Sequence, residues 1–399
     1  MKLVMKFDWF TIKAEEFITF NHTERLPKGA TAKKVAMEHI SPFVKKITAS
    51  ETAQFNGGSK FRNGDTLMAR ITPCLENGKT AYVDFLDKGE IGFGSTEFIV
   101  LREKPGISDK TFIYYLCTNP SFREIAIQSM VGSSGRQRVQ QNVLDNLELH
   151  VPSLKGQKEI GYALRILDEK IENNTKINHH LEQIAQAIFK SWFIDFEPFG
   201  GVLPRDWREG TIRDTCSAIF NGGTPHRNEP QFWGGNIPWL TSAEVRQAII
   251  TKPNNCISEA GLKGSSAKWV PSLSTVIALY GATAGQVSMV TSPLTTNQAI
   301  CALVPKERHK FYNYLVMRNA VTQLENKAIG SAQQNISKAI VEETPCLIVD
   351  NNVITEFDLL VSPLFNKWIQ NLFESSQLHE LRDTILPRLL SGELSVADI

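Results

Sequence analysis

KEIGYALRILDEKI, which occupies residues 158–171, is matched in its apolar pattern by TEFDLLVSPLFNKWI from residue 355. LEQIAQAIFKSWF from residue 181 is matched in the same way by LHELRDTILPRLL from residue 378, so the offset is 197 residues in both cases. A shorter phrase, VQQNVLDNL from residue 139, is echoed by AQQNISKAI from residue 332, at an offset of 193 residues. Solenoid units recur roughly every 20–50 residues, so a repeat at these much larger offsets is not a solenoid unit. We therefore interpret the chain as a duplicated half-protein. Each half is a globular domain followed by a long helix.

The two repeated helical stretches have the apolar spacing of coiled-coil helices. A seam with alternating steps of three and four residues passes through Asn174 and Asn178 in the first stretch, and through Asn371 and Ser375 in the second. If the helices pack antiparallel, Asn178 meets Asn371 and Asn174 meets Ser375, and polar seam residues of this kind fix the register. The alternative is two ordinary amphipathic helices in separate cores. The other seam positions are Ile160, Leu164, Leu167, Ile171, Leu181, Ala185, Ile188, Trp192, Phe357, Val361, Leu364, Trp368, Leu378, Arg382, Ile385 and Leu389.

Both globular segments are predicted to have an α+β fold with the same order of elements. In the first, residues 64–71 and 96–101 have the composition of strands, and residues 108–119 have the apolar spacing of a capped helix. The corresponding segments of the second are 274–281, 296–304 and 310–319. We therefore predict two globular mixed α/β domains and two helical spacers that form an antiparallel coiled coil. In chain order, these four parts are residues 1–150, 151–198, 199–345 and 346–399.

Composition indicates a folded cytoplasmic protein without membrane-spanning segments. The chain has 399 residues, of which 42% are hydrophobic, and no apolar run reaches the roughly 18 residues that span a bilayer. Its six cysteines lack Cys-x-x-Cys spacing, which indicates free thiols and argues against a zinc site. The net charge of +1 is unevenly distributed, since the four predicted parts carry +3, −1, +4 and −5 in chain order. A polyanion would therefore bind the globular segments.

The sequence contains no constellation of catalytic residues. ENGKT at residues 76–80 ends like a phosphate-binding loop, but Pro73 stands where such a loop needs its first glycine. The Asp/Asn-Pro-Pro-Phe/Tyr signature of amino-methyltransferases is absent, as are His pairs with metal-ligand spacing and a Gly-x-Ser-x-Gly elbow. We predict that the chain is not an enzyme, holds no metal and binds no cofactor of its own.

Side chains suited to nucleic acid gather in predicted turns of both globular segments. GSSGRQRVQQN at residues 132–142 combines a Gly/Ser turn with arginine, which pairs with guanine, and with glutamine and asparagine, which pair with adenine. Because Gln-Gln-Asn recurs in both halves, an N-cap or phosphate-positioning role is the alternative for that phrase. Trp233, Trp239 and Trp269 are interpreted as core residues. The candidate DNA-binding residues are Lys60, Arg62, Arg70, Lys79, Arg136, Arg138, Gln140, His226, Arg227, Ser242, Tyr280 and Gln333.

Several longer phrases carry a resemblance to a known family. The second half contains NGGTPHRNEPQFWGGNIPWLTSAEV from residue 221, STVIALYGATAGQV from residue 274, TTNQAICAL from residue 295, GSAQQNISKAIV from residue 330 and ILPRLLSGEL from residue 385. The first half contains LMARITPCLENGK from residue 67 and VPSLKGQKEI from residue 151. In combination, over essentially the whole chain, these phrases resemble the specificity (S) subunit of type I restriction–modification systems. The first domain lacks the Gly-Thr-Pro and Trp-Gly-Gly phrases of the second.

The resemblance implies a sequence-specific DNA-binding protein with two target-recognition domains. Each domain would read one half of a bipartite target in double-stranded DNA, and the helices would set the spacing between the half-sites. The helices would also dock methyltransferase (M) subunits, two in number, which bring S-adenosylmethionine and methylate adenine at N6. Restriction (R) subunits, which use ATP and Mg²⁺, would join this complex. The alternative function is a helical-rod scaffold that binds protein partners and no DNA.

Overall fold

The computed structural model describes residues 7–329 and 335–398. Within these ranges, no helix is both long and apolar enough to cross a bilayer. The chain divides into two compact units, one formed by Met1–Glu172 with Ser376–Ile399 and the other by Asn173–Ser375. Each unit therefore holds one globular domain together with part of each long helix, which is a different partition from the four parts predicted above.

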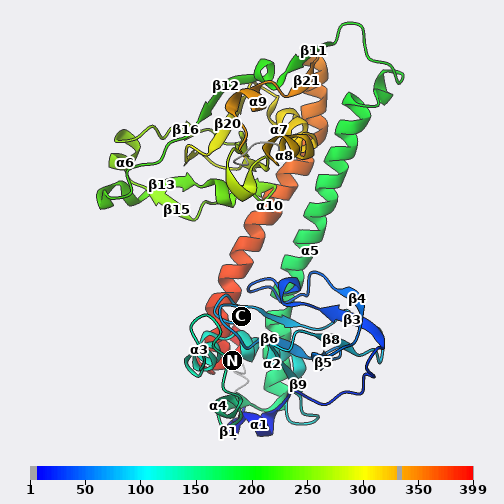
Figure 1. Cartoon of the computed structure of the whole chain (residues 1–399), viewed down its shortest axis with the longest axis vertical. Coiled ribbons are helices and arrows are strands. Elements are labelled where there is room, and N and C mark those ends of the chain that lie inside the picture. Colours follow the sequence, from blue (N-terminus) through cyan, green and yellow to red (C-terminus); the bar gives the residue numbers. More distant parts are fainter. Residues whose placement is uncertain (1–6, 330–334, 399) are drawn as a thin grey trace. The chain divides into compact units, whose positions relative to one another are not determined.

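The first globular domain is built on two four-stranded sheets (Figure 1). Its strands are β1 (Trp9–Lys13), β2 (Ile18–Phe20), β3 (Thr31–Val35), β4 (Glu51–Gln54), β5 (Ser59–Phe61), β6 (Thr66–Ala69), β7 (Thr80–Tyr82), β8 (Gly92–Gly94), β9 (Phe98–Glu103) and β10 (Glu148–Pro152). One sheet has the order β2-β9-β6-β7 and is antiparallel throughout. The other has the order β4-β3-β8-β5, with β3 and β8 parallel. A ribbon of β1 and β10 leads into the first long helix.

The second globular domain repeats this topology and adds one edge strand. Its strands are β11 (Arg208–Thr211), β12 (Cys216–Asn221), β13 (Trp233–Leu240), β14 (Ile249–Ile250), β15 (Asn255–Ile257), β16 (Trp269–Val270), β17 (Thr275–Ala278), β18 (Val287–Val290), β19 (Leu294–Thr296), β20 (Ile300–Pro305) and β21 (Pro345–Ile348). One sheet has the order β12-β20-β17-β18, with β14 added at its edge, and the other has the order β15-β13-β19-β16. Here too the only parallel pair of the second sheet within the described residues is its central one, β13 with β19. The predicted internal repeat is confirmed.

Three helices of each domain correspond in order: α2 (Lys110–Thr118), α3 (Pro120–Gln128) and α4 (Gln141–Asp145) in the first, and α7 (Lys310–Asn319), α8 (Val321–Ile329) and α9 (Lys338–Glu342) in the second. The short helix α1 (Ala14–Phe17), between β1 and β2, is matched by a 3₁₀ helix at Ile212–Thr215, whereas α6 (Glu259–Lys263), between β15 and β16, has no described counterpart in the first domain. The Asp109 carboxylate caps α2 by accepting hydrogen bonds from the backbone N–H groups of Thr111 and Phe112, both at 3.0 Å. Such a cap satisfies N–H groups that the helix itself leaves without acceptors.

The described residues beside the Gln-Gln-Asn phrases do not correspond at the offset of the phrases. The backbone N–H of Val139 donates to the carbonyl of Arg70, the residue that follows β6, at 2.9 Å. In the same way, the N–H of Ile336 donates to the carbonyl of Leu279, the residue that follows β17, at 2.8 Å. Val139 therefore corresponds to Ile336, at the same 197-residue offset as the helices. The alignment of the phrases at an offset of 193 is wrong by four residues. The two halves therefore correspond here through the residues that bond to the end of a core strand, and the short polar phrase does not indicate the correct alignment.

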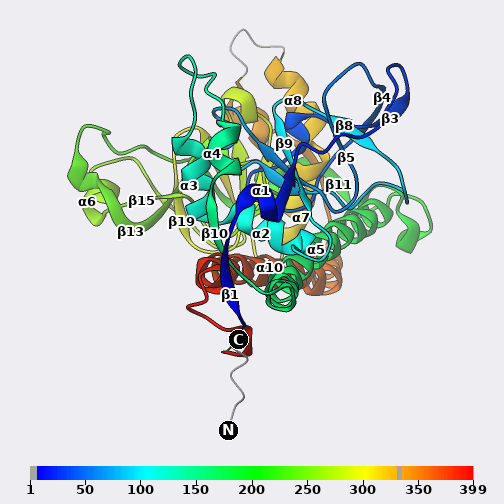
Figure 2. The same cartoon turned by 90° about the horizontal axis from the view of Figure 1, so that it is seen from below.

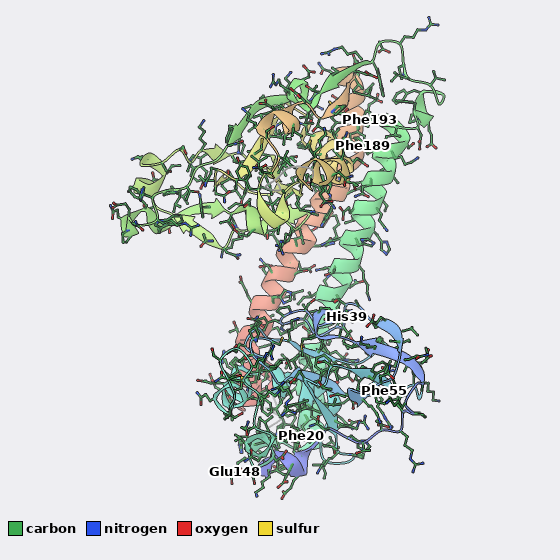
Figure 3. The ribbon with its side chains drawn as sticks, viewed as in Figure 1. Phe20, His39, Phe55, Glu148, Phe189 and Phe193 are labelled. Carbon is green, nitrogen blue, oxygen red and sulfur yellow. The ribbon has the colours of Figure 1, made fainter. Side chains whose placement is uncertain are left out.

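The long helices α5 (Leu154–Phe193) and α10 (Asn351–Leu390) lie side by side within each unit (Figures 1 and 2). In the first unit, Leu164 of α5 and Leu389 of α10 are buried in one core with the first domain. In the second unit, Phe189 and Phe193, labelled on α5 in Figure 3, share a core with Phe357 of α10. The ring centroids of Phe193 and Phe357 lie 4.9 Å apart. Each globular domain is thus packed onto both helices.

The polar seam residues pair across the two helices, within the second unit. The Asn371 amide Nδ2 donates to the Asn178 Oδ1 at 2.9 Å, and the Asn174 Nδ2 donates to the Ser375 Oγ at 3.3 Å. The Asn174 Nδ2 also donates to the Glu374 carboxylate at 2.8 Å. These partners are the ones expected for antiparallel helices. Among the remaining seam residues, the buried ones are Ile160, Leu164, Ala185, Phe357, Val361, Trp368, Arg382, Ile385 and Leu389, and the partly buried ones are Leu167, Ile171, Leu181, Ile188, Trp192, Leu364 and Leu378.

Candidate DNA interface

Arg136 lies at the tip of a closed turn between α3 and α4. Gly132 and Gly135 adopt positive φ values of 144° and 76°, which side chains with a Cβ rarely tolerate. Val131 and Arg138 close the turn with two reciprocal backbone hydrogen bonds, each of 3.0 Å. The Arg136 side chain is exposed, and no ion pair with the described residues holds it. The turn therefore presents this guanidinium to solvent, where it is free to meet a phosphate or a base edge.

Arg138, on the same turn, is engaged inside the protein. Its Nε donates to the Glu97 Oε2 at 2.9 Å and its Nη2 donates to the Glu97 Oε1 at 2.6 Å. The hydrogen bond from Arg138 lowers the pKa of the Glu97 carboxyl; burial acts in the opposite direction, and the charges of Arg138 and Arg70 add to the lowering. The guanidinium fork that would pair with guanine is thus occupied by a carboxylate.

Lys60 and Arg62 belong to a network around Glu24, whose side chain is only 4% exposed. Arg62 and Arg102 both donate to the Glu24 carboxylate, and Arg102 also binds Asp65 through two hydrogen bonds of 2.6 Å. The Lys60 Nζ donates to the Glu24 carbonyl oxygen at 2.8 Å. Burial alone would raise the pKa of the Glu24 carboxyl, but the hydrogen bonds from Arg62 and Arg102 outweigh it and lower the pKa. These two candidate residues therefore stabilise the first domain.

Lys60 and Arg70 also line a common cavity of about 260 Å³, together with His22 and Thr96. The Arg70 Nε is buried and has no hydrogen-bond partner among the described residues, although its Nη2 donates to the Val139 carbonyl at 3.4 Å. The cavity thus joins two of the predicted cationic residues in one place. The cavity is open to solvent, and Glu24, Phe98 and Val100 line it as well.

Lys79 and Gln140, two further candidates of the first domain, donate to backbone carbonyls of the same domain. The Lys79 Nζ donates to the Met37 carbonyl at 2.8 Å. Gln140 occupies the N-cap position of α4, but its side chain makes no capping hydrogen bond, and its Nε2 instead donates to the Arg138 carbonyl at 3.2 Å. An N-cap role for the Gln140 side chain is therefore wrong. Gln140 takes part in the first turn of α4 only through its backbone carbonyl, which accepts a hydrogen bond from the Val143 N–H at 3.1 Å.

In the second domain, His226 and Arg227 stand on the exposed loop that follows β12. The loop begins with Gly222 and Gly223, and a Cβ on Gly222 would lie 2.1 Å from the Thr296 carbonyl oxygen. This close approach explains why glycine occupies the position. The loop is tied down again where the Trp233 Nε1 donates to the His226 carbonyl at 3.2 Å. No ion pair with a described residue engages the Arg227 guanidinium.

Ser242 contacts the short 3₁₀ helix that follows Tyr280. The Ser242 carbonyl accepts a hydrogen bond from the Thr283 hydroxyl at 2.9 Å, and Tyr280 is the N-cap residue of the helix Gly281–Thr283. The Tyr280 side chain is 43% exposed. Asn297 links this region to the core of the sheet, since its N–H donates to the Leu240 carbonyl at 3.0 Å. Of the remaining predicted residues, Gln333 lies outside the described part of the chain.

The turn at Asn297 is built alike in both domains. The Asn297 Oδ1 accepts a hydrogen bond from the Ala299 N–H at 3.2 Å, and in the first domain the Ser95 Oγ accepts one from the Glu97 N–H at 3.1 Å. Both turns precede a central strand, β20 or β9. In the second domain the next residue, Gln298, accepts a hydrogen bond from the Thr224 hydroxyl at the start of the His226 loop. Loops that carry candidate residues therefore converge on one structurally repeated turn.

Residues 7–183 and 204–352 match the type I restriction modification DNA specificity domain. The chain belongs to this family. The type I restriction enzyme HindI specificity subunit of Haemophilus influenzae is 27% identical, over 84% of this chain and 87% of that protein. The MjaIX specificity subunit of Methanocaldococcus jannaschii is 26% identical, over 72% of this chain and 70% of that protein. The S subunit of a type I restriction–modification system from M. genitalium shares the fold, with a TM-score of 0.60 at 18% identity over 98% of both chains.

One exposed residue of this specificity-domain protein was interpreted wrongly from its sequence. Trp269 was expected in the core, but its side chain is 46% exposed, whereas Trp239 is buried and its Nε1 donates to the Gly223 carbonyl at 3.0 Å. Val270, the next residue in β16, is fully buried. Since side chains alternate across a strand, the apolar Val270 was the available signal that Trp269 faces outward. Trp269 joins the candidate residues as an exposed aromatic side chain.

The described His, Cys, Asp and Glu side chains form no further candidate site. They include no group of three or more that could bind a metal ion, and all six cysteines are free. Burial raises the pKa of the Cys301 thiol to about 12, so this thiol stays protonated and inert at neutral pH. The larger cavity of about 650 Å³, between α5, α7 and β21, has an apolar lining that includes Phe189 and Tyr312, and no candidate residue lines it.

Proposed function

We propose that this chain selects the target of a type I restriction–modification enzyme, and that each globular domain reads one half of a bipartite sequence in double-stranded DNA. The observation that carries the proposal is one strand topology with different surface side chains. The repeated backbone bridges make Ile71 equivalent to the exposed Tyr280, and the repeated turn makes Thr96 equivalent to Gln298. One scaffold with different side chains at equivalent positions suits two different half-sites, because base-edge contacts depend on the side chain.

The two long helices are proposed to set the spacing between the half-sites and to dock methyltransferase subunits. Tyr162 of α5 and Leu359 of α10 are equivalent positions, 197 residues apart, and their side chains are 56% and 66% exposed. Contiguous exposed apolar side chains mark contact surfaces for partner proteins, and Ile166, one turn after Tyr162, and Leu360, next to Leu359, are exposed as well. Their repetition in both units supports two equivalent docking surfaces, and hence two methyltransferase subunits. Restriction subunits would join the same complex.

The chemistry is assigned to the partner subunits. In this proposal the methyltransferase subunits carry S-adenosylmethionine and transfer its methyl group to adenine N6, while ATP and Mg²⁺ serve the restriction subunits. The chain described here acts by binding and orientation. Because the target base must leave the stack to be methylated, the readers would hold the DNA while it is distorted.

Mapping of N6-methyladenine by single-molecule sequencing tests the proposal. DNA would be compared between cells that express this chain with its methyltransferase and matched cells that lack only this chain. We expect a split motif, with two defined halves around a fixed undefined gap, only when the chain is present. Co-purification of the chain with the methyltransferase, measured in the same cells, would distinguish a chain that assembles but reads no sequence.

A motif that is methylated equally without the chain would overturn the proposal. Co-purification without any new motif would replace sequence selection by a scaffold role.

A further inference from the structure

A buried ion pair joins the two long helices in the first unit. The Arg382 Nη1, on α10, donates to the Asp168 Oδ1, on α5, at 2.7 Å, and the two side chains are 10% and 5% exposed. The Tyr115 hydroxyl, from α2, donates to the other Asp168 oxygen at 2.5 Å. Burial lowers the pKa of Arg382, but the charge and hydrogen bond of Asp168 outweigh this and raise it. Both Asp168 oxygens thus accept a hydrogen bond, and the Arg382 Nε and Nη2 donate to the neighbouring Asp383 at 2.9 and 2.8 Å.

The equivalent positions in the second unit are apolar. Positions 197 residues away from Asp168 and Arg382 are Phe365 and Ala185, which are 0% and 1% exposed in one core. The equivalent of Tyr115 is Tyr314, since each follows the first phenylalanine of its helix by three residues. The Tyr314 ring lies 5.6 Å from the Phe365 ring. The Tyr314 hydroxyl is buried and has no hydrogen-bond partner among the described residues. The duplicated interface thus has two ends of opposite chemistry.

This asymmetry matters because a duplicated helix has two possible partners. Each long helix is able to pair antiparallel with the other helix of its own chain or with the same helix of a second copy. In a pair of two α5 helices, the repeat would set Asp168 against the second copy's Ala185, and the buried carboxylate would lose its arginine. In a pair of two α10 helices, Phe365 would face the guanidinium of Arg382. A buried charge without its partner is strongly unfavourable.

The polar centre of the seam does not make this distinction. Asn178 meets Asn371 within the chain, and in a pair of two α5 helices it would meet Asn174 of the second copy. In a pair of two α10 helices Asn371 would meet Ser375. Amide and hydroxyl groups both donate and accept hydrogen bonds, so these side chains are able to pair within the chain and in either pair of identical helices. The centre fixes the register, and the choice of partner rests on the two ends.

We propose that the Asp168–Arg382 and Phe365–Ala185 contacts make α5 and α10 recognise each other within one chain, and exclude pairing with the same helix of a second copy. The proposal is independent of DNA reading. It assigns to Arg382 and Ala185 the role of positioning residues, because their side chains determine which two helices can pair. Specificity between partners is often obtained in this way, by penalising the wrong pair.

Moving the arginine from one helix to the other tests the proposal in the full chain. A185R/R382A leaves the composition unchanged, and by the repeat it matches each helix to a second copy of itself while it removes the Arg382 guanidinium from Asp168 within the chain. The Lys45 ammonium, which donates to the Tyr115 hydroxyl at 3.3 Å, belongs to the first domain and is unchanged by the exchange. We expect the wild-type mass in native mass spectrometry to be that of one chain, and the A185R/R382A mass to be twofold larger. D168F/F365D, the reverse exchange, is expected to give the same twofold increase.

The fourfold variant D168F/A185R/F365D/R382A is the matched control. It moves the ion pair from the first unit to the second, where Tyr314 is placed to donate to the new carboxylate, and it is expected to restore the mass of one chain. Co-expression of two differently tagged copies gives the same information where yields are low: co-capture is expected for both exchange variants and absent for the wild type and the fourfold variant. An exchange variant that stays a single chain, a wild type that co-captures, or a fourfold variant that stays paired would each overturn the proposal.

Discussion

Arg382→Ala is expected to loosen the first unit at the helix pair. The substitution removes the Arg382 guanidinium from Asp168, whose side chain is 5% exposed and keeps only the Tyr115 hydroxyl as a described donor. The Lys45 ammonium, which donates to that hydroxyl at 3.3 Å, remains. Loss of one partner from a buried ion pair destabilises by about 3–5 kcal/mol. Since every 1.4 kcal/mol is tenfold in an equilibrium, amides that exchange through opening of this helix pair should exchange roughly 100- to 4,000-fold faster.

Hydrogen–deuterium exchange with mass spectrometry measures this in the full chain, on peptides from residues 154–172 and 376–390. Arg388→Ala is the matched control, because Arg388 lies on the same helix and pairs with Glu393 at 3.0 Å, with both side chains largely exposed. An exposed pair contributes about 0–1 kcal/mol, so its loss should change exchange by less than about fivefold. Equal effects of the two substitutions would refute the reasoning that burial makes the Asp168 pair important.

Three further predictions follow from the contacts of other residues. Asn371→Leu should cost about 1–3 kcal/mol because it leaves Asn178 buried without its donor, whereas the double replacement N178L/N371L should recover most of this in a thermal unfolding assay. Glu24 has a pKa below its ordinary value of 4.5 in the folded state, so its contribution is present above pH 4.5 and is lost as the pH falls through the folded pKa. The stability difference between wild type and Glu24→Gln should therefore shrink on acidification below pH 4.5, and a constant difference in urea unfolding would contradict this. Trp269→Ala should weaken DNA binding in a fluorescence anisotropy assay without changing stability, whereas Trp239→Ala should cost about 3–5 kcal/mol of folding free energy.

The helical half of the architecture was predictable because periodicity encodes it directly. The seam follows from apolar spacing, and the partners of Asn178 and Asn174 follow from the repeat and an antiparallel orientation. Which end of the interface carries the ion pair was not predicted, although Asp168 and Arg382 are both visible in the sequence. Asp168 lies next to the seam position Leu167 rather than on it, so the heptad pattern alone gave no reason to bury a carboxylate there.

The candidate interface was predicted less well because charged residues have two uses. Arg138 and Arg62 have the composition of DNA contacts, yet their carboxylate partners, Glu97 and Glu24, lie 41 and 38 residues away in the sequence. Only the folded chain brings those pairs together. Arg136 has no such partner among the described residues, and it remains the candidate of this turn that is free for DNA.

The most direct test of the account is to map N6-methyladenine in cells whose copy of this chain carries Arg136→Ala or Arg227→Ala, beside the wild type. These two exposed arginines belong to different domains. We expect each substitution to relax or weaken recognition in one half of the split motif, a different half for each, and to leave the gap between the halves unchanged. Relaxation of the same half by both substitutions, or a change in the length of the gap, would contradict the claim that each domain reads one half-site.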